Sequence, residues 1–187
     1  MSLDCCTKQV RPSHWRSMTA AALARLAVAG MLLLLSGHAP AFAQGAQAGR
    51  TPWPAFTLTN LDGATQSSDA LKRPGRWLVV LLRRPCASCE PVLSLVDKQS
   101  AENRASRVVV IVSRAPRADI DRLKARFPNL AAAAWYLDVN GQAAQALHAA
   151  EAPVVIGVEG DAIAWSWKGL ALQPAAFEAT LSGWLKE

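Results

Sequence analysis

The stretch RWLVVLLRRPCASCEPVL, residues 76–93, joins an apolar run to two cysteines in a C-x-x-C spacing. The run over 76–82 lies between Gly75 and Pro85 and is apolar at every position after the first, which is typical of a strand buried on both faces. Apolar residues at helical spacing follow the cysteines and predict a helix over 89–103. The sequence therefore places the C-x-x-C motif between a buried strand and the N-terminus of a helix.

The remaining patterns alternate between strands and helices. They predict a strand entering an Asp-Gly turn over 55–66, a second buried strand over 107–113, a helix over 116–127, a weaker strand over 132–138, a short helix ending at His148, a β-hairpin over 152–169 and an amphipathic helix over 173–186. This order favours an α/β fold with a central mixed β-sheet flanked by helices, in which the central strands are parallel and one edge is antiparallel.

The N-terminal quarter of the chain has the pattern of a secretory leader. The segment from Met18 carries a basic residue, a short apolar core and a small-x-small site ending at Ala43. We therefore expect a signal peptide over 1–43, with Met18 as an alternative true start, a flexible lead-in over 44–54 and one domain over 55–187. The apolar core falls short of the about 20 residues that span a bilayer, so we expect an exported, periplasmic protein, with uncleaved membrane anchoring as the alternative.

The charge balance gives no case for a nucleic-acid partner. The chain has 20 Lys+Arg and 14 Asp+Glu, and four of the basic residues and one of the acidic residues precede Gln44. The excess of +3 that remains beyond the leader includes no block of basic residues longer than a pair. A monomer that does not bind nucleic acid is expected.

Cys86 and Cys89 are the only cysteines after the leader, so a disulfide within that part of the chain joins these two neighbours. A bridge across so small a loop removes little entropy from the unfolded chain and so adds little stability. This argues against a purely structural role for the disulfide. Backbone N–H groups and the dipole at a helix N-terminus favour a thiolate, which suggests Cys86 as the nucleophile and Cys89 as the resolving thiol. With His148 as the only histidine beyond the leader, no zinc site is expected, although two thiolates could hold Cu(I).

Three segments together resemble the thioredoxin superfamily, in its exported bacterial branch of TlpA-, ResA- and CcmG-like redoxins. They are PAFTLTNLDGATQSSDALK over 54–72, LVVLLRRPCASC over 78–89, and APVV with GDAIAWSWKG within 152–169. The resemblance covers the mature chain and implies a thioredoxin-like fold with an N-terminal hairpin and a central insertion. It also implies that Pro153 is cis and lies against the cysteine pair, where the backbone of Ala152 pairs with an extended substrate segment.

Two positions depart from the pattern of that branch. Pro85 stands immediately before the first cysteine, where a tryptophan is usual, so Pro85 is expected to shape the substrate surface in its place. Val80 stands where thioredoxins carry a buried carboxylate that accepts the proton of the inner thiol. Glu90 and Glu151 are the nearest alternatives in sequence, and each is also explained as a solvated surface charge.

The resemblance implies a periplasmic thiol-disulfide oxidoreductase that reduces exported cysteine-containing proteins and receives electrons from a membrane donor. No cofactor is expected beyond the redox-active Cys86–Cys89 disulfide. A disulfide donor or isomerase remains an alternative, as does a non-catalytic thioredoxin-like module that binds a partner or handles copper.

Overall fold

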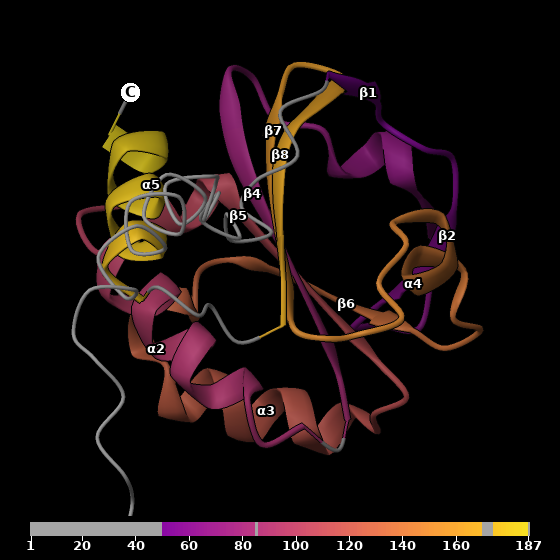
Figure 1. Ribbon diagram of the computed structural model, residues 1–187. Helices are drawn as coiled ribbons and strands as arrows, with labels where there is room; N and C mark the ends of the chain where they lie inside the picture. The colour runs from indigo at the N-terminus through magenta and orange to yellow at the C-terminus, as the bar shows by residue number, and fades with distance from the viewer. Residues whose placement is uncertain (1–49, 85, 170–173, 187) are drawn as a thin grey trace, which may run out of the picture. The chain divides into compact units, whose positions relative to one another are not determined.

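The computed structural model describes residues 50–84, 86–169 and 174–186 (Figure 1). The expected signal peptide, the first part of the lead-in and Pro85 lie outside these ranges. The strands are β1 (Thr51–Pro52), β2 (Thr57–Asn60), β3 (Thr65–Ser67), β4 (Arg76–Arg83), β5 (Val108–Ser113), β6 (Ala134–Asp138), β7 (Val154–Glu159) and β8 (Ala162–Lys168). The α-helices are α2 (Cys89–Gln99), α3 (Arg117–Arg126), α4 (Gln142–Ala146) and α5 (Pro174–Lys186), and short 3-10 turns span Ser68–Leu71, Arg104–Arg107 and Pro128–Leu130. None of the helices in these ranges has the length and apolar character needed to cross a bilayer.

The described strands form one mixed sheet in the order β1-β8-β7-β4-β5-β6-β2-β3. Strands β4, β5 and β6 run parallel, whereas β7 pairs antiparallel with β4 and β8 pairs antiparallel with β7. Strands β2 and β3 form the expected N-terminal hairpin, which joins the sheet through β6. The mixed sheet, with its parallel centre and antiparallel edge, confirms the expected fold class.

Helices cover both faces of the sheet (Figure 1). Alternate residues of β4 enter different core clusters: Leu78, Val80 and Leu82 pack with α2, α3 and α5, and Trp77, Val79 and Leu81 pack on the face that α4 covers. All six side chains are fully buried. The sequence analysis attributed the continuous apolar run to a strand buried on both faces, and the structure confirms this. A central strand with helices on both sides exposes neither face to water.

The expected flexible lead-in is wrong for its last residues, because Thr51 to Pro54 belong to the domain. Thr51 and Pro52 form β1 and pair with the start of β8. The Trp53 side chain is buried, packs edge-on against Trp77 at 5.1 Å and donates from Nε1 to the Ser68 carbonyl at 3.1 Å. A two-residue strand is too short to show an alternating pattern in the sequence. The burial of the Trp53 indole therefore sets the start of the domain, and the sequence alone does not show it.

Helix α2 ends at Gln99 and not at the expected Asn103. Ser100 is the C-cap, and its hydroxyl donates to the Val96 carbonyl at 2.7 Å. Glu102 and Asn103 then have positive φ angles of 63° and 66°. A left-handed backbone cannot continue a right-handed helix, so the chain turns there toward β5.

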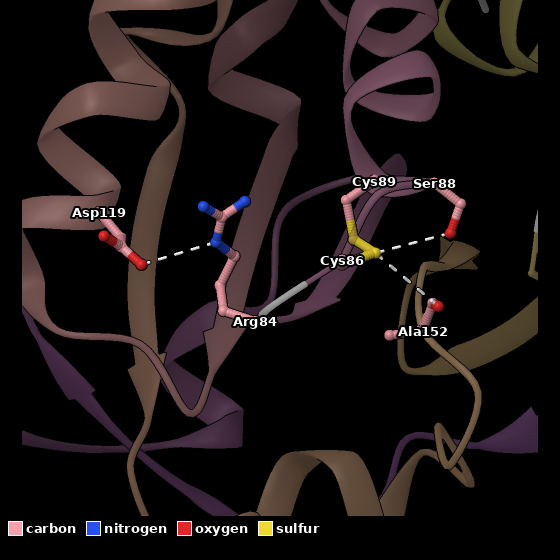
Figure 2. Close-up of a disulfide and its surroundings, with 6 residues drawn as sticks. All are labelled: Arg84, Cys86, Ser88, Cys89, Asp119 and Ala152. Atoms are coloured by element: carbon pink, nitrogen blue, oxygen red, sulfur yellow. Dashed lines mark hydrogen bonds and ion pairs between the residues drawn. A yellow bond between two sulfur atoms is a disulfide. The ribbon is translucent and has the colours of Figure 1, made fainter.

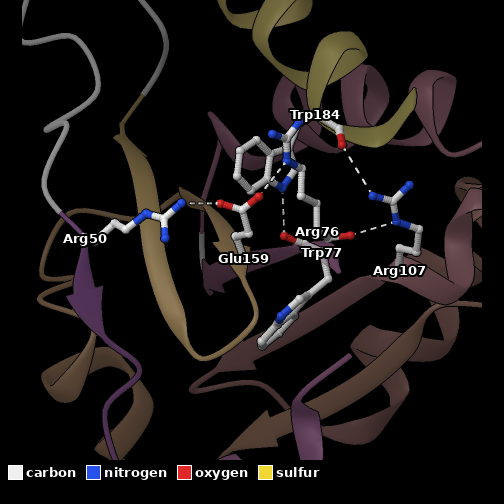
Figure 3. Close-up of polar contacts among 6 residues, drawn as sticks. All are labelled: Arg50, Arg76, Trp77, Arg107, Glu159 and Trp184. Atoms are coloured by element: carbon white, nitrogen blue, oxygen red, sulfur yellow. Dashed lines mark hydrogen bonds and ion pairs between the residues drawn. The ribbon is translucent and has the colours of Figure 1, made fainter. Parts of the chain in front are cut away.

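The C-terminal helix is fastened to the start of β4 by a polar cluster (Figure 3). Trp184 Nε1 donates to the Trp77 carbonyl at 3.0 Å, and the Arg76 guanidinium lies 4.9 Å from the centre of the Trp184 ring. Arg76 Nε also pairs with Glu159 at 3.1 Å, and Arg107 Nε donates to the Arg76 carbonyl at 2.7 Å. These contacts join α5, β4, β7 and the 3-10 turn that precedes β5 at one end of the sheet.

Gly157 is required by the packing of an indole on β7. A Cβ atom at this position would lie 2.2 Å from the Trp165 ring, which covers the glycine from β8 across an irregularity in the register. Trp165 also packs edge-on against Trp184 at 5.5 Å, and Trp167 packs against Phe177 at 5.5 Å. The tryptophans of β8 are therefore packing residues.

We predict that Gly157→Ala lowers the free energy of unfolding by about 1–3 kcal/mol, because the added methyl group forces the Trp165 ring out of its position. Urea unfolding followed by tryptophan fluorescence measures the change. Gly183→Ala is the matched control in α5, where a Cβ meets nothing within 4 Å, and it should leave stability equal or raise it by up to about 1 kcal/mol. Equal stability of Gly157→Ala and the wild type would contradict the packing.

Candidate active site

Cys86 and Cys89 form a disulfide at the point where β4 gives way to α2 (Figure 2). The sulfurs are 2.07 Å apart and the Cα atoms 5.5 Å apart. Cys89 is the first residue of α2, and Pro91 stands in its first turn, where the missing N–H would have no helical partner. The local sequence thus builds a strand, a short turn and a helix around the two sulfurs, as expected.

The two cysteines differ sharply in exposure. Cys89 is 1% exposed and belongs to the core cluster under α2, among residues such as Val92 and Leu93. Cys86 is only partly buried and packs at the margin of the same cluster. An external thiol or disulfide can therefore reach the sulfur of Cys86, while Cys89 is reached from Cys86 alone.

Two polar groups lie beside the Cys86 sulfur (Figure 2). The Ser88 hydroxyl is 3.6 Å from Sγ and the Ala152 carbonyl oxygen is 3.9 Å from it. A disulfide sulfur carries no proton, so Ser88 is the donor in this form and the Ala152 carbonyl could accept only from a reduced thiol. The sequence shows Ser88 only as one of the two residues between the cysteines, and the turn geometry brings its hydroxyl to the sulfur.

The Ala152–Pro153 peptide bond is cis and leads directly into β7. Val154 pairs with Leu81 of β4, and the Pro153 carbonyl accepts from the Gly169 backbone at 2.8 Å. This pairing places Ala152 next to Cys86, although 66 positions separate them in the chain. Pro153 is buried and Ala152 partly exposed, so the backbone of Ala152 is the accessible part of the turn. Their role in substrate binding, like that of Pro85, stays a prediction.

Arg83 and Arg84 diverge to opposite sides, as alternation along a strand requires. Arg83 Nη1 donates to the Ala150 carbonyl at 3.3 Å, in the segment that leads to the Ala152 turn. Arg84 turns toward α3, where its Nε lies 3.5 Å from Asp119 (Figure 2). Arg83 therefore contacts the segment that leads to Ala152, whereas Arg84 contacts α3, and both segments lie beside the disulfide loop.

Among the described residues, no buried carboxylate takes the place of the one that thioredoxins carry at the position of Val80. Val80 is fully buried among apolar neighbours. Within the described ranges Asp138 is the only buried charged residue, and its oxygens accept from the first backbone N–H groups of α4 at 3.0 and 3.2 Å. Glu90 pairs with Arg126 on the surface at 2.7 Å, and Glu151 is exposed. Glu90 and Glu151 were the candidates for the proton acceptor of Cys89. Both are surface charges, which was the alternative explanation for these residues.

His148 lies just beyond α4 and is exposed, with a φ of 50°. Helix α4 ends at Ala146, two residues before the expected end at His148, and no described contact places the His148 ring against either cysteine. Its imidazole lines the cavities on either side of the end of α4. Within the described ranges, no three residues of the His, Cys, Asp and Glu types gather as a metal site would need.

The comparisons with known proteins establish the fold. No family model and no curated protein matches the chain, but solved structures do. A secreted Mycobacterium tuberculosis disulfide oxidoreductase, homologous to DsbE of E. coli, is 20% identical with a TM-score of 0.56 over 70% of this chain and 94% of its own. A putative thiol:disulfide interchange protein DsbE from Chlorobium tepidum is 16% identical with a TM-score of 0.57, over 73% of this chain and 96% of its own. A putative protein disulfide isomerase from Bacteroides thetaiotaomicron is 16% identical with a TM-score of 0.56, over 78% of this chain and 96% of its own. The chain has the thioredoxin-like fold that the resemblance implied.

We predict that, after reduction, iodoacetamide alkylates Cys86 well before Cys89, because Cys86 is partly exposed whereas Cys89 is 1% exposed. Peptide mass spectrometry of samples quenched at successive times measures the two rates. Alkylation in urea is the control, in which both cysteines should react at similar rates. Equal rates in the folded protein would show that the burial difference does not govern reactivity.

Proposed function

We propose that the protein is a thiol-disulfide oxidoreductase in which Cys86 and Cys89 are the redox-active pair. The observation that carries this proposal is the disulfide itself, which joins one accessible and one buried sulfur at the start of a helix. A structural bridge needs no such asymmetry. A thiol-disulfide exchange reaction needs this asymmetry. One sulfur must be accessible to the substrate, and the other must be shielded until it attacks the mixed disulfide.

In reduction, the Cys86 thiolate attacks one sulfur of a substrate disulfide. A bond forms between the two sulfurs, the substrate S–S bond breaks, and the leaving thiolate takes a proton from water. Cys89 then gives its proton to water and attacks Cys86 Sγ, the mixed disulfide bond breaks, and the second substrate thiolate is released and takes a proton from water. Two electrons and two protons pass to the substrate, and the protein is left as the Cys86–Cys89 disulfide.

The substrate chain is held at the turn that carries Ala152. Its carbonyl lies 3.9 Å from Cys86 Sγ, and the residue is partly exposed. An extended segment that contributes its own cysteine to Cys86 can therefore pair with this backbone in the manner of an added strand. Such pairing recognises the backbone of the partner, which suits an enzyme that acts on more than one protein.

The substrates that we propose are exported cysteine-containing proteins in the periplasm, reduced with electrons from a dithiol donor at the membrane. The leader-like sequence over 1–43 supports export. The M. tuberculosis protein of similar fold is described as secreted, which supports the same compartment. The reaction requires no metal or organic cofactor, since both electrons reside on the two sulfurs.

We expect the protein to accelerate insulin reduction by dithiothreitol, measured as turbidity, and Cys86→Ser to fall to the uncatalysed rate. Cys89→Ser should lose turnover but accumulate a mixed disulfide with the substrate, visible by non-reducing electrophoresis, because Cys86 can still attack. Equal activity of wild type and Cys86→Ser would end the enzyme proposal. A module that only binds a partner would instead keep its function in Cys89→Ser, whereas a carrier that holds Cu(I) with both thiolates would lose the metal in either variant.

The direction of electron flow is tested by equilibrating the Cys86–Cys89 couple with glutathione buffers. A reductase should have a potential near the about −270 mV of thioredoxin, whereas a disulfide donor should lie near the about −120 mV of DsbA. The oxidised fraction is measured by thiol trapping and mass. A value close to the donor end would reverse the proposed direction while leaving the exchange chemistry in place.

A further inference from the structure

A cationic pocket opens beside the disulfide loop at the carboxyl ends of β4 and β5. Its volume is about 400 Å³, and its lining includes Arg83, Ser113, Arg114, Gln145 and His148. No aspartate or glutamate is among the lining residues. The two guanidinium groups give the pocket a positive charge.

The two arginines reach the pocket from neighbouring parallel strands. Arg83 is the last residue of β4 and points to the face that α4 covers, where the Ala150 carbonyl accepts from its Nη1 at 3.3 Å. Arg114 follows β5 directly, with a φ of 58°, and is exposed. Neither arginine forms an ion pair with a carboxylate of the described residues. Their charges are therefore available to a ligand.

The pocket lies within reach of a substrate attached to Cys86. Ala150, which Arg83 contacts, is two residues from Ala152, so their Cα atoms are at most about 7 Å apart. The Ala152 carbonyl is in turn 3.9 Å from Cys86 Sγ. An extended chain advances about 3.3 Å per residue, so a side chain two to four residues from the substrate cysteine reaches the arginines.

We propose that this pocket binds an acidic side chain of the substrate polypeptide, two to four residues from the cysteine that Cys86 attacks. This inference rests on the proposed exchange function and names the class of substrate that the site prefers. A carboxylate accepts two parallel hydrogen bonds from a guanidinium, which fixes orientation as well as adding attraction. Partner proteins with Asp or Glu close to the reactive cysteine are therefore attacked faster than neutral or basic partners.

The test uses peptides with one cysteine joined by a disulfide to 2-thiopyridine, whose release is followed by absorbance. The peptides are identical except for Glu, Gln or Lys three residues from the cysteine, on either side. With reduced wild-type protein, we expect the second-order rate constant for the Glu peptide to exceed that for the Gln peptide by about threefold to tenfold at low salt, and the Lys peptide to be slowest. The ratio should fall as salt is added.

Arg83→Gln and Arg114→Gln should each bring the ratio of the Glu and Gln rate constants toward one. Lys72→Gln is the matched control, since it removes one exposed charge beyond the other end of β4, and it should leave the ratio unchanged. Arg83→Lys keeps the charge but loses the planar fork, so it should retain an intermediate ratio. If Arg83→Gln fails to fold by circular dichroism, the exposed Arg114 carries the test alone.

The outcomes separate the two proposals. Absence of thiopyridone release from every peptide would overturn the exchange function itself. Release with a ratio near one, or a ratio that survives both arginine substitutions, would overturn the acidic-substrate pocket and leave the exchange function standing. Oxidised glutathione provides the remaining arm, because it also carries carboxylates: a dependence on the arginines for glutathione but not for the peptides would assign the pocket to a small thiol and overturn the proposal.

Discussion

The complete burial of β4 on both faces controls where chemistry can occur in this protein. Leu78 to Leu82 are fully buried between the two layers of helices, and β5 and β7 satisfy the backbone of the strand on both sides. A polar or reactive side chain within this stretch would lose its hydration without a partner. Toward the carboxyl end of the strand, charge and sulfur therefore appear only at its last residue, Arg83, and beyond it at Cys86.

The neighbours of β4 determine what surrounds that end. The Ser113 carbonyl of β5 accepts from the Arg84 backbone at 3.1 Å, which holds the start of the loop, and β7 delivers Ala152 to the other side. Farther along the sheet, the buried carboxylate of Asp138 accepts from two N–H groups of α4 and fixes the helix that forms a wall of the cationic pocket. The disulfide loop is thus shaped by strands that are distant in sequence but adjacent in the sheet.

The strong periodic patterns of the sequence were sufficient for the fold. The apolar run of β4, the hairpin over 152–169 and the three-residue separation of the cysteines each involve local signals, and the structure has each element. Signals that depend on tertiary contact were invisible: burial of Trp53 fastens part of the expected lead-in, and left-handed residues shorten α2. The pocket formed by Arg83 and Arg114 was also missed, because these residues are 31 positions apart and meet only when β4 and β5 pair in parallel.

The polar cluster around Trp184 lies at the amino end of β4, whereas the disulfide follows its carboxyl end, about 25 Å away along the eight-residue strand. Arg50, the first described residue, also joins this cluster through Glu159 at 2.8 Å (Figure 3). Arg50 and Trp184 of α5 therefore both lie at the end of the sheet opposite to the disulfide. A surface tether, fluorescent label or fused protein attached near either residue would leave Cys86 turned toward the solution, so the domain is suited to immobilisation without obstruction of its reactive face.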